Sequence, residues 1–241
     1  MKQRISVKNI QSASETSSRQ SESVHIQLLT ADSLEWLKQK RDQSITNILS
    51  GIPDMEEIGE TDISSYTRWV ERVVKLLFQK TQPKGYVILI QTDRKIAGQW
   101  LDKSTVINNV ASRSRWRLLW HKIVLNRPVG SANLHRPTYS HMLCYSQLSK
   151  PGNAIPDVIY AGDRWYKNGT PVEAVKLAIS FLLEKENQWS NEGSDSFDIV
   201  DPFVGQGTIL YYAREAGLSA LGIDIDPDQI LETRRNLLEK S

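Results

Sequence analysis

Short apolar runs alternate with longer amphipathic segments over most of the chain. The runs VHIQLLT, ITNILS, GYVILIQT, FDIVD and SALGID have the length and residue types of buried strands. The clearest amphipathic segment is 64–81, where Trp69, Val73, Leu76 and Leu77 recur at helical spacing. This alternation predicts an α/β fold with a mostly parallel sheet and helices on both faces.

The middle of the chain is less regular. WRLLWHKIVL and YSHMLCYS have the pattern of strands, and a helix is expected over about 103–112. The loop NRPVGSANLHRPT and the stretch LSKPGNAIPDVIYAGDRWYKNGT are rich in Pro, Gly and Asn, which is typical of loops that carry function. The second stretch leads to a helix that we expect to begin with Thr170 as its cap and Pro171 at its first position.

Composition excludes several classes of protein. The single cysteine, Cys144, rules out an internal disulfide and a Cys-rich zinc site, and the histidines lack the spacing of metal ligands, so no metal is expected. No apolar run approaches the roughly 18 residues of a membrane span, and the N-terminus lacks a signal-peptide core. We expect an intracellular protein, cytoplasmic or nuclear, with an organellar location left open and no membrane partner.

Charge is distributed unevenly, although the net charge is only +2. The stretch from Arg94 to Arg136 is strongly basic, and Asp93 and Asp102 are the only acids in it or directly before it. Such an excess indicates a surface that meets phosphate, the alternative being a solvated basic face. The residues expected to contact nucleic acid are Arg94, Lys95, Arg113, Arg115, Arg127, His135 and Arg136.

One segment near the end of the chain, DIVDPFVGQGTILYYAREAGLSALGIDIDPDQ, has the order strand, glycine turn, helix, strand and acid. Gly205 and Gly207 let the backbone turn tightly and approach a ligand, and Thr208 begins the helix. Asp224, at the end of the next strand, is placed to accept hydrogen bonds from ribose hydroxyls. The pattern predicts a nucleoside-binding unit, but Leu210 replaces the third glycine that NAD-binding units carry.

The stretch DPFVGQGT resembles the Asp-Pro-Phe-x-Gly-x-Gly-Thr motif of S-adenosylmethionine-dependent methyltransferases that modify exocyclic amino groups of DNA bases. The resemblance implies a class I, Rossmann-like methyltransferase fold. It also implies that the first acid lies near the methionine part of the cofactor, that the glycines accommodate the cofactor, and that the second acid binds ribose. These roles would fall on Asp201, Phe203, Gly205, Gly207, Thr208 and Asp224.

Because few residues follow Asp224, the rest of the sheet must precede the motif, as in the circularly permuted group of these enzymes. LLTADSLEWLKQKRDQSITNILSGIPD is similar to the opening of that group, and the resemblance places Asp32 near the adenine amino group. NGTPVEAVKLAISFL resembles the helix that helps to close the methionine pocket, with Thr170 and Pro171 at its start.

The resemblance implies a single permuted methyltransferase domain over residues 24–241. Its catalytic part would be 24–150 and its cofactor part 165–241. Residues 1–23, rich in Ser, Gln and charge, are expected to form a flexible tail.

The expected catalytic loop departs from the family pattern. The DNA enzymes have Ser/Asp-Pro-Pro-Tyr or a close variant here, whereas SGIPD keeps Ser50 and Pro53 but lacks the second proline and the aromatic residue. Asp54 is the best candidate for a catalytic carboxylate. A binding role without chemistry and a solvated turn are the alternatives for Asp54, Glu56 and Glu57. The missing ring could be replaced by Tyr66, Tyr139, Trp165 or Tyr166.

We therefore expect an S-adenosylmethionine-dependent methyltransferase that acts on nucleic acid. RNA is narrowly favoured over DNA, because the chain lacks a separate domain large enough to read a duplex and because the loop is not of the DNA type. One alternative is an amino-specific DNA methyltransferase. Another is a catalytically inert, methyltransferase-like subunit that binds nucleic acid or protein. Association as a homodimer or with a partner subunit is compatible with the sequence.

Overall fold

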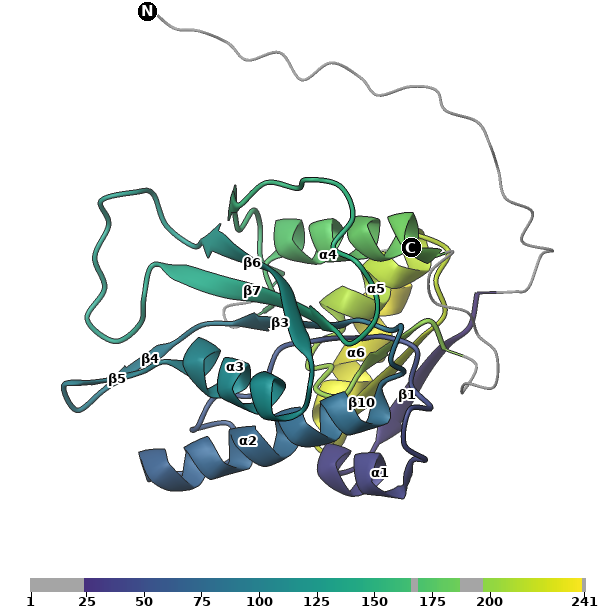
Figure 1. Ribbon diagram of the computed structural model, residues 1–241, viewed down its shortest axis with the longest axis horizontal. Coiled ribbons are helices and arrows are strands. Elements are labelled where there is room, and N and C mark those ends of the chain that lie inside the picture. Colours follow the sequence, from purple (N-terminus) through teal and green to yellow (C-terminus); the bar gives the residue numbers. More distant parts are fainter. Residues whose placement is uncertain (1–23, 166–168, 187–196, 240–241) are drawn as a thin grey trace, which may run out of the picture.

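The computed structural model describes residues 24–165, 169–186 and 197–239. Among these residues, eight strands form one sheet in the order β1-β10-β9-β2-β3-β7-β6-β8 (Figure 1). β7 runs antiparallel to both of its neighbours, and every other pairing is parallel. The strands are β1 (Ile26–Thr30), β2 (Ile48–Ser50), β3 (Val87–Gln91), β6 (Arg117–Leu125), β7 (Tyr139–Ser146), β8 (Val158–Tyr160), β9 (Ile199–Asp201) and β10 (Ala220–Asp224).

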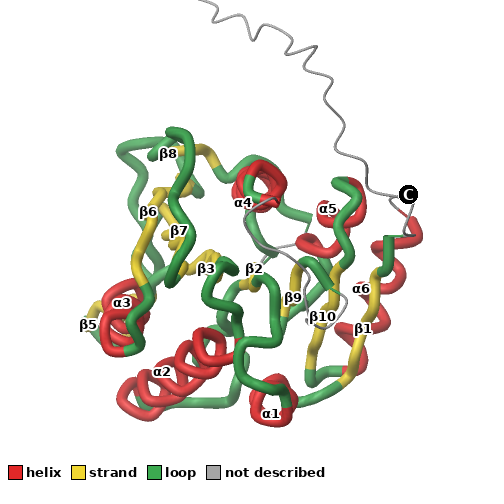
Figure 2. The backbone as a smooth tube through the Cα atoms, turned by 45° about the vertical axis from the view of Figure 1, so that its right-hand side comes forward, coloured by secondary structure: helices red, strands yellow, loops and turns green. Residues whose placement is uncertain are grey.

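Helices cover both faces of this sheet (Figure 2). One face packs on α1 (Ser33–Gln39), α2 (Ile63–Lys80) and α3 (Lys103–Arg113), and the other on α4 (Val172–Glu184), α5 (Thr208–Glu215) and α6 (Pro227–Glu239). The central strands are buried on both sides; β3, for example, has five buried residues in succession. Burial on both faces explains why the sequence shows continuous apolar runs here rather than alternation.

The last two strands of the chain, β9 and β10, lie inside the sheet between β1 and β2. β10 lies between β1 and β9, and β9 in turn lies beside β2. The carboxyl ends of β1, β10, β9 and β2 therefore share one edge, where open α/β sheets bind their ligands. The expected catalytic and cofactor parts are consequently interleaved, because β1 from the first part pairs with β10 from the second.

Three local features differ from the sequence-based expectations. Pro171, rather than Thr170, is the cap of α4: its backbone carbonyl accepts the first helical hydrogen bond, from the Val175 N–H, at 3.1 Å. A small hairpin of β4 (Arg94–Ile96) and β5 (Gln99–Leu101) was not predicted, and neither was β8. These strands have three residues each and are mostly not buried, so they lack the apolar run that revealed the equally short but buried β2 and β9.

The single cysteine is fully buried on β7, and burial raises the pKa of the Cys144 thiol, as expected for an inert core residue. Within the described ranges, no helix has both the length and the apolar content that a membrane crossing requires.

Candidate active site

The glycine loop joins β9 to α5 and has the geometry that the motif predicts. Gly207 caps α5 with a left-handed backbone, φ +85°, and Thr208 is the first helical residue. A Cβ atom on Gly207 would lie 2.5 Å from the side chain of Thr233. Both the backbone conformation and the close approach of α6 therefore require glycine at this position.

Two side chains of α6 donate hydrogen bonds to backbone carbonyls of the glycine loop. The Thr233 hydroxyl donates to the Gly205 carbonyl at 2.5 Å, and the Asn236 amide donates to the Gln206 carbonyl at 3.1 Å. Thr233 is fully buried. Sequence reasoning missed both residues, and the only available signal was a threonine on the apolar face of the last helix.

Asp201 is the last residue of β9, and its carboxyl is almost completely buried. The Ser50 hydroxyl donates to it at 2.6 Å, and the Phe203 N–H donates to the same oxygen at 3.2 Å. Burial raises the pKa of Asp201 to about 7, although both hydrogen bonds oppose the change. The site thus contains a carboxyl that can exchange a proton near neutral pH.

Asp224 ends β10 on the same edge. Its carboxylate accepts hydrogen bonds from the Gly205 N–H at 3.1 Å and the Asp226 N–H at 3.0 Å, so it also fixes the glycine loop. Partial burial raises its pKa. The next residue, Ile225, is 67% exposed, an apolar side chain beside a polar strand end that the sequence analysis did not single out.

Asp32 and Phe203 complete this edge. The exposed Asp32 carboxylate caps α1, accepting from the Leu34 N–H at 2.8 Å and the Glu35 N–H at 3.1 Å. Its neighbour Ser33 donates to the Pro202 carbonyl, which connects α1 to the loop after β9. Phe203 packs against Trp69 of α2, with ring centroids 6.0 Å apart.

The SGIPD loop follows β2 directly beside β9. The fully buried Tyr66 of α2 donates from its hydroxyl to the Pro53 carbonyl at 2.7 Å and so anchors the loop from beneath. Tyr66 is therefore unavailable as a ring that stacks on a ligand. Of the other candidates, Trp165 packs against Tyr211 at 4.9 Å, Tyr139 contacts His141 edge-on, and Tyr166 lies outside the described residues.

Asp54 is the centre of a partly buried cluster of ion pairs. Its carboxylate lies 2.5 Å from the Lys103 ammonium, 2.9 Å from the Arg136 guanidinium and 3.4 Å from the Arg94 guanidinium. Glu56 also pairs with Arg94. Since Lys103 is only 2% exposed, its charge depends on this carboxylate for compensation.

The expected basic surface divides into two parts. Arg94, Lys95, His135 and Arg136 come together, because the Lys95 N–H donates to the His135 carbonyl at 3.1 Å and Arg136 reaches Asp54. Arg127 lies at the start of the loop that carries His135 and Arg136, shortly after the end of β6.

Arg113 and Arg115 lie elsewhere. They stand at and beyond the far end of α3, whose first residue, Lys103, contacts Asp54. Eleven helical residues span about 16 Å. The structure therefore does not bring these two arginines to the strand ends.

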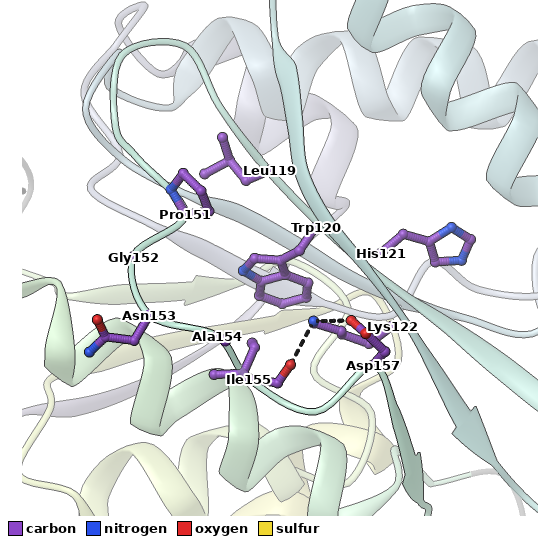
Figure 3. Close-up of a pocket in the computed structure, with 10 residues that line it drawn as sticks. All are labelled: Leu119, Trp120, His121, Lys122, Pro151, Gly152, Asn153, Ala154, Ile155 and Asp157. Atoms are coloured by element: carbon purple, nitrogen blue, oxygen red, sulfur yellow. Dashed lines mark hydrogen bonds and ion pairs between the residues drawn. The ribbon is translucent and has the colours of Figure 1, made fainter.

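A separate cavity of about 450 Å³ lies between β6 and the loop 151–157 (Figure 3). The buried Lys122 ammonium donates to the Ile155 carbonyl at 2.9 Å and pairs with Asp157 at 2.7 Å. None of the predicted site residues lines this cavity. In the part of the chain that the structure describes, no group of three or more His, Cys, Asp or Glu side chains could hold a metal ion.

No family model and no curated protein matches the sequence. Solved structures do match. A candidate DNA modification methylase from Thermus thermophilus has a TM-score of 0.65 at 17% identity, covering 90% of this chain and 95% of that one; the same protein has been solved with S-adenosyl-L-methionine.

Two further structures show the same likeness. PvuII DNA methyltransferase (cytosine-N4-specific) has a TM-score of 0.62 at 15% identity and covers 87% of this chain and 85% of its own. M1.HpyAVI in complex with SAM has a TM-score of 0.55 at 14% identity and covers 88% of this chain and 99% of its own. The chain therefore has the Rossmann-like class I fold of methyltransferases.

Proposed function

We propose that the chain is an S-adenosylmethionine-dependent methyltransferase that modifies an exocyclic amino group of a DNA base. The observation that carries this proposal is the hydrogen bond from Ser50 to Asp201, which joins the candidate catalytic strand end to the glycine-loop strand. The similar structures named above act on DNA or bind SAM according to their descriptions. The sequence-based preference for RNA finds no support among them, so DNA becomes the leading substrate. We also interpret the central position of the late strands β9 and β10 as the circular permutation expected from the sequence.

The residues at the strand ends fit the cofactor. The buried Thr208 hydroxyl has no hydrogen-bond partner within the described residues, so the start of α5 offers a polar atom to a ligand. Asp224 and the exposed Ile225 offer acceptors for ribose hydroxyls and an apolar contact for a base ring. Ionised Asp201 would supply negative charge toward the cationic methionine end, and Asp32 would lie near the adenine amino group. When bound, S-adenosylmethionine supplies an electrophilic methyl group on a sulfonium.

The chemical work left to the chain is mainly positioning. Methyl transfer to nitrogen requires the amino group to be held in line with the donor, and a fixed loop with hydrogen-bond acceptors provides this. Tyr66 fixes the SGIPD loop at the Pro53 carbonyl, and Ser50 fixes its beginning against Asp201. The proton lost from the amino nitrogen passes to solvent.

The contacts of Asp54 favour a positioning role over a catalytic role as a proton acceptor. A carboxylate that lies within 3 Å of both Lys103 and Arg136 already serves two cations. Those cations belong to α3 and to the loop before β7, so Asp54 ties the SGIPD loop to both segments. We therefore propose that Asp54 orders the substrate side of the site.

The proposal is tested by incubating the purified protein with methyl-labelled S-adenosylmethionine and separate duplex DNA, single-stranded DNA and RNA pools. Digestion to nucleosides should reveal an N-methylated adenine or cytosine from DNA. Label confined to RNA would restore the RNA alternative. Calorimetry provides the control: absence of cofactor binding would refute the enzyme assignment, whereas cofactor binding without transfer to any pool would favour the inert subunit.

A further inference from the structure

The β4–β5 hairpin carries an exposed tryptophan beside the candidate active site. Trp100 on β5 is 50% exposed, which is unusual for the largest apolar side chain. The hairpin lies outside the main sheet and projects on the same side of the molecule as the loop between β6 and β7 (Figure 1). The exposed half of the indole is therefore accessible to another molecule.

Buried polar groups fix the orientation of this ring. The Trp100 indole N–H donates to Asp93 Oδ2 at 3.0 Å. Asp93 is only 2% exposed; its other oxygen accepts from the Lys103 N–H at 3.0 Å, and the His141 Nε2 atom lies 3.1 Å from Oδ2. A side chain anchored in this way loses little conformational freedom when a ligand binds, so its contact surface is preorganised.

A lysine lies over the ring. Lys95 pairs with Trp100 across the hairpin, and its ammonium lies 5.0 Å from the ring centroid. The same ammonium donates to the Asn133 carbonyl at 3.0 Å, which connects the hairpin to the loop between β6 and β7. Arg94, the neighbour of Lys95, belongs to the Asp54 cluster. A stacking surface beside positive charge is the combination that single-stranded nucleic acid binds.

We propose that Trp100 is a stacking site for an unpaired base of a DNA strand bound at the candidate active site. The inference rests on the proposed function, because the bound strand is the methyltransferase substrate. It also accounts for the SGIPD loop, which has no aromatic residue of its own. The hairpin supplies a ring from a neighbouring segment, and the Lys95 ammonium beside that ring places positive charge near the adjacent phosphates.

The test compares two single strands of equal charge, one with bases and one abasic, each about 12 nucleotides long. Binding is followed by fluorescence anisotropy at fixed salt, with the wild type and the Trp100→Ala and Trp100→Phe variants. Tyr160→Ala is the matched control, because Tyr160 is an aromatic residue that is 65% exposed on the edge strand β8, outside the β4–β5 hairpin. Thermal unfolding of each variant verifies that the fold is intact.

Trp100→Ala should weaken binding of the base-bearing strand about 5- to 100-fold and leave binding of the abasic strand unchanged. Trp100→Phe should retain most of the affinity, and Tyr160→Ala should bind both strands as the wild type does. An equal loss on both strands, or no loss on either, would overturn the stacking site. If DNA is still methylated in that case, only this inference fails; if the wild type neither binds nor methylates DNA, the proposed function fails as well. If Trp100→Ala weakened the binding of an RNA strand of the same sequence more than that of the DNA strand, the assignment to DNA would be overturned.

Discussion

The Ser50 hydroxyl donates a 2.6 Å hydrogen bond to the Asp201 carboxyl across the neighbouring strands β2 and β9. Residues 151 positions apart in the sequence thus share one buried contact. Because Asp201 begins the glycine loop and Ser50 begins the SGIPD loop, this bond couples the candidate cofactor site to the candidate catalytic loop.

Stability of the ligand-free protein should depend on Asp201 and pH. Burial raises the pKa of Asp201 to about 7, so the native state retains a proton that the unfolded chain loses from about pH 4 upward. The stabilisation from this group is present in full at acid pH and is lost as the pH rises to about 7. At about pH 8, Asp201→Asn should raise the free energy of unfolding relative to wild type by up to roughly 4 kcal/mol, at about 1.4 kcal/mol per pKa unit.

Urea denaturation at about pH 5 and about pH 8 measures this effect. The difference in the free energy of unfolding between the variant and the wild type should be smaller at the lower pH. The variant should also bind S-adenosylmethionine more weakly, because asparagine cannot supply the negative charge. Identical pH dependence of the wild type and the variant would contradict the raised pKa.

Gly207→Ala should be more damaging than Gly217→Ala. Both residues have a left-handed backbone, φ +85° and +76°, so alanine is strained at either position by about 1–2 kcal/mol. A Cβ on Gly207 also collides with Thr233, whereas nothing lies within 4 Å of one on Gly217. The free energy of unfolding should therefore fall by about 1–3 kcal/mol more for Gly207→Ala, and only this variant should lose cofactor affinity by calorimetry. Equal effects of the two substitutions would mean that α6 does not constrain the loop.

The glycine loop and the strand ends were predictable because local rules govern them. A buried parallel strand leaves an apolar run, and Gly207 has a backbone conformation that only glycine adopts easily, so Asp201 and Asp224 could be placed from the sequence alone. The ion pairs of Asp54 and the hydrogen bond from Thr233 to Gly205 could not be predicted, because they join residues that only tertiary packing brings together. Charge counting likewise grouped Arg113 with Arg136, although Arg113 ends α3 and Arg136, in the loop before β7, contacts Asp54 near the start of that helix.

Asp54→Asn should affect stability and substrate affinity more than the chemical step. Removing the charge leaves the buried Lys103 ammonium uncompensated, which should lower the free energy of unfolding by about 3 kcal/mol. Lys103→Met in the same background should recover part of this loss, because the unpaired charge is then gone. In methyl-transfer assays, KM for DNA should rise while kcat changes less. A large fall in kcat with KM unchanged would instead support Asp54 as a proton acceptor.

Arg127→Ala and Arg113→Ala should differ in their effect on nucleic-acid binding. Arg127 is exposed shortly after β6, at the edge that carries the hairpin, whereas Arg113, with a side chain 74% exposed, lies at the far end of α3. Loss of one phosphate contact to a single strand should reduce the slope of log K against log salt by about 0.7. Anisotropy titrations at several salt concentrations should show this change for Arg127→Ala and none for Arg113→Ala. If the two variants have the same slope, the basic stretch acts as one diffuse surface and the division into two parts has no consequence for binding.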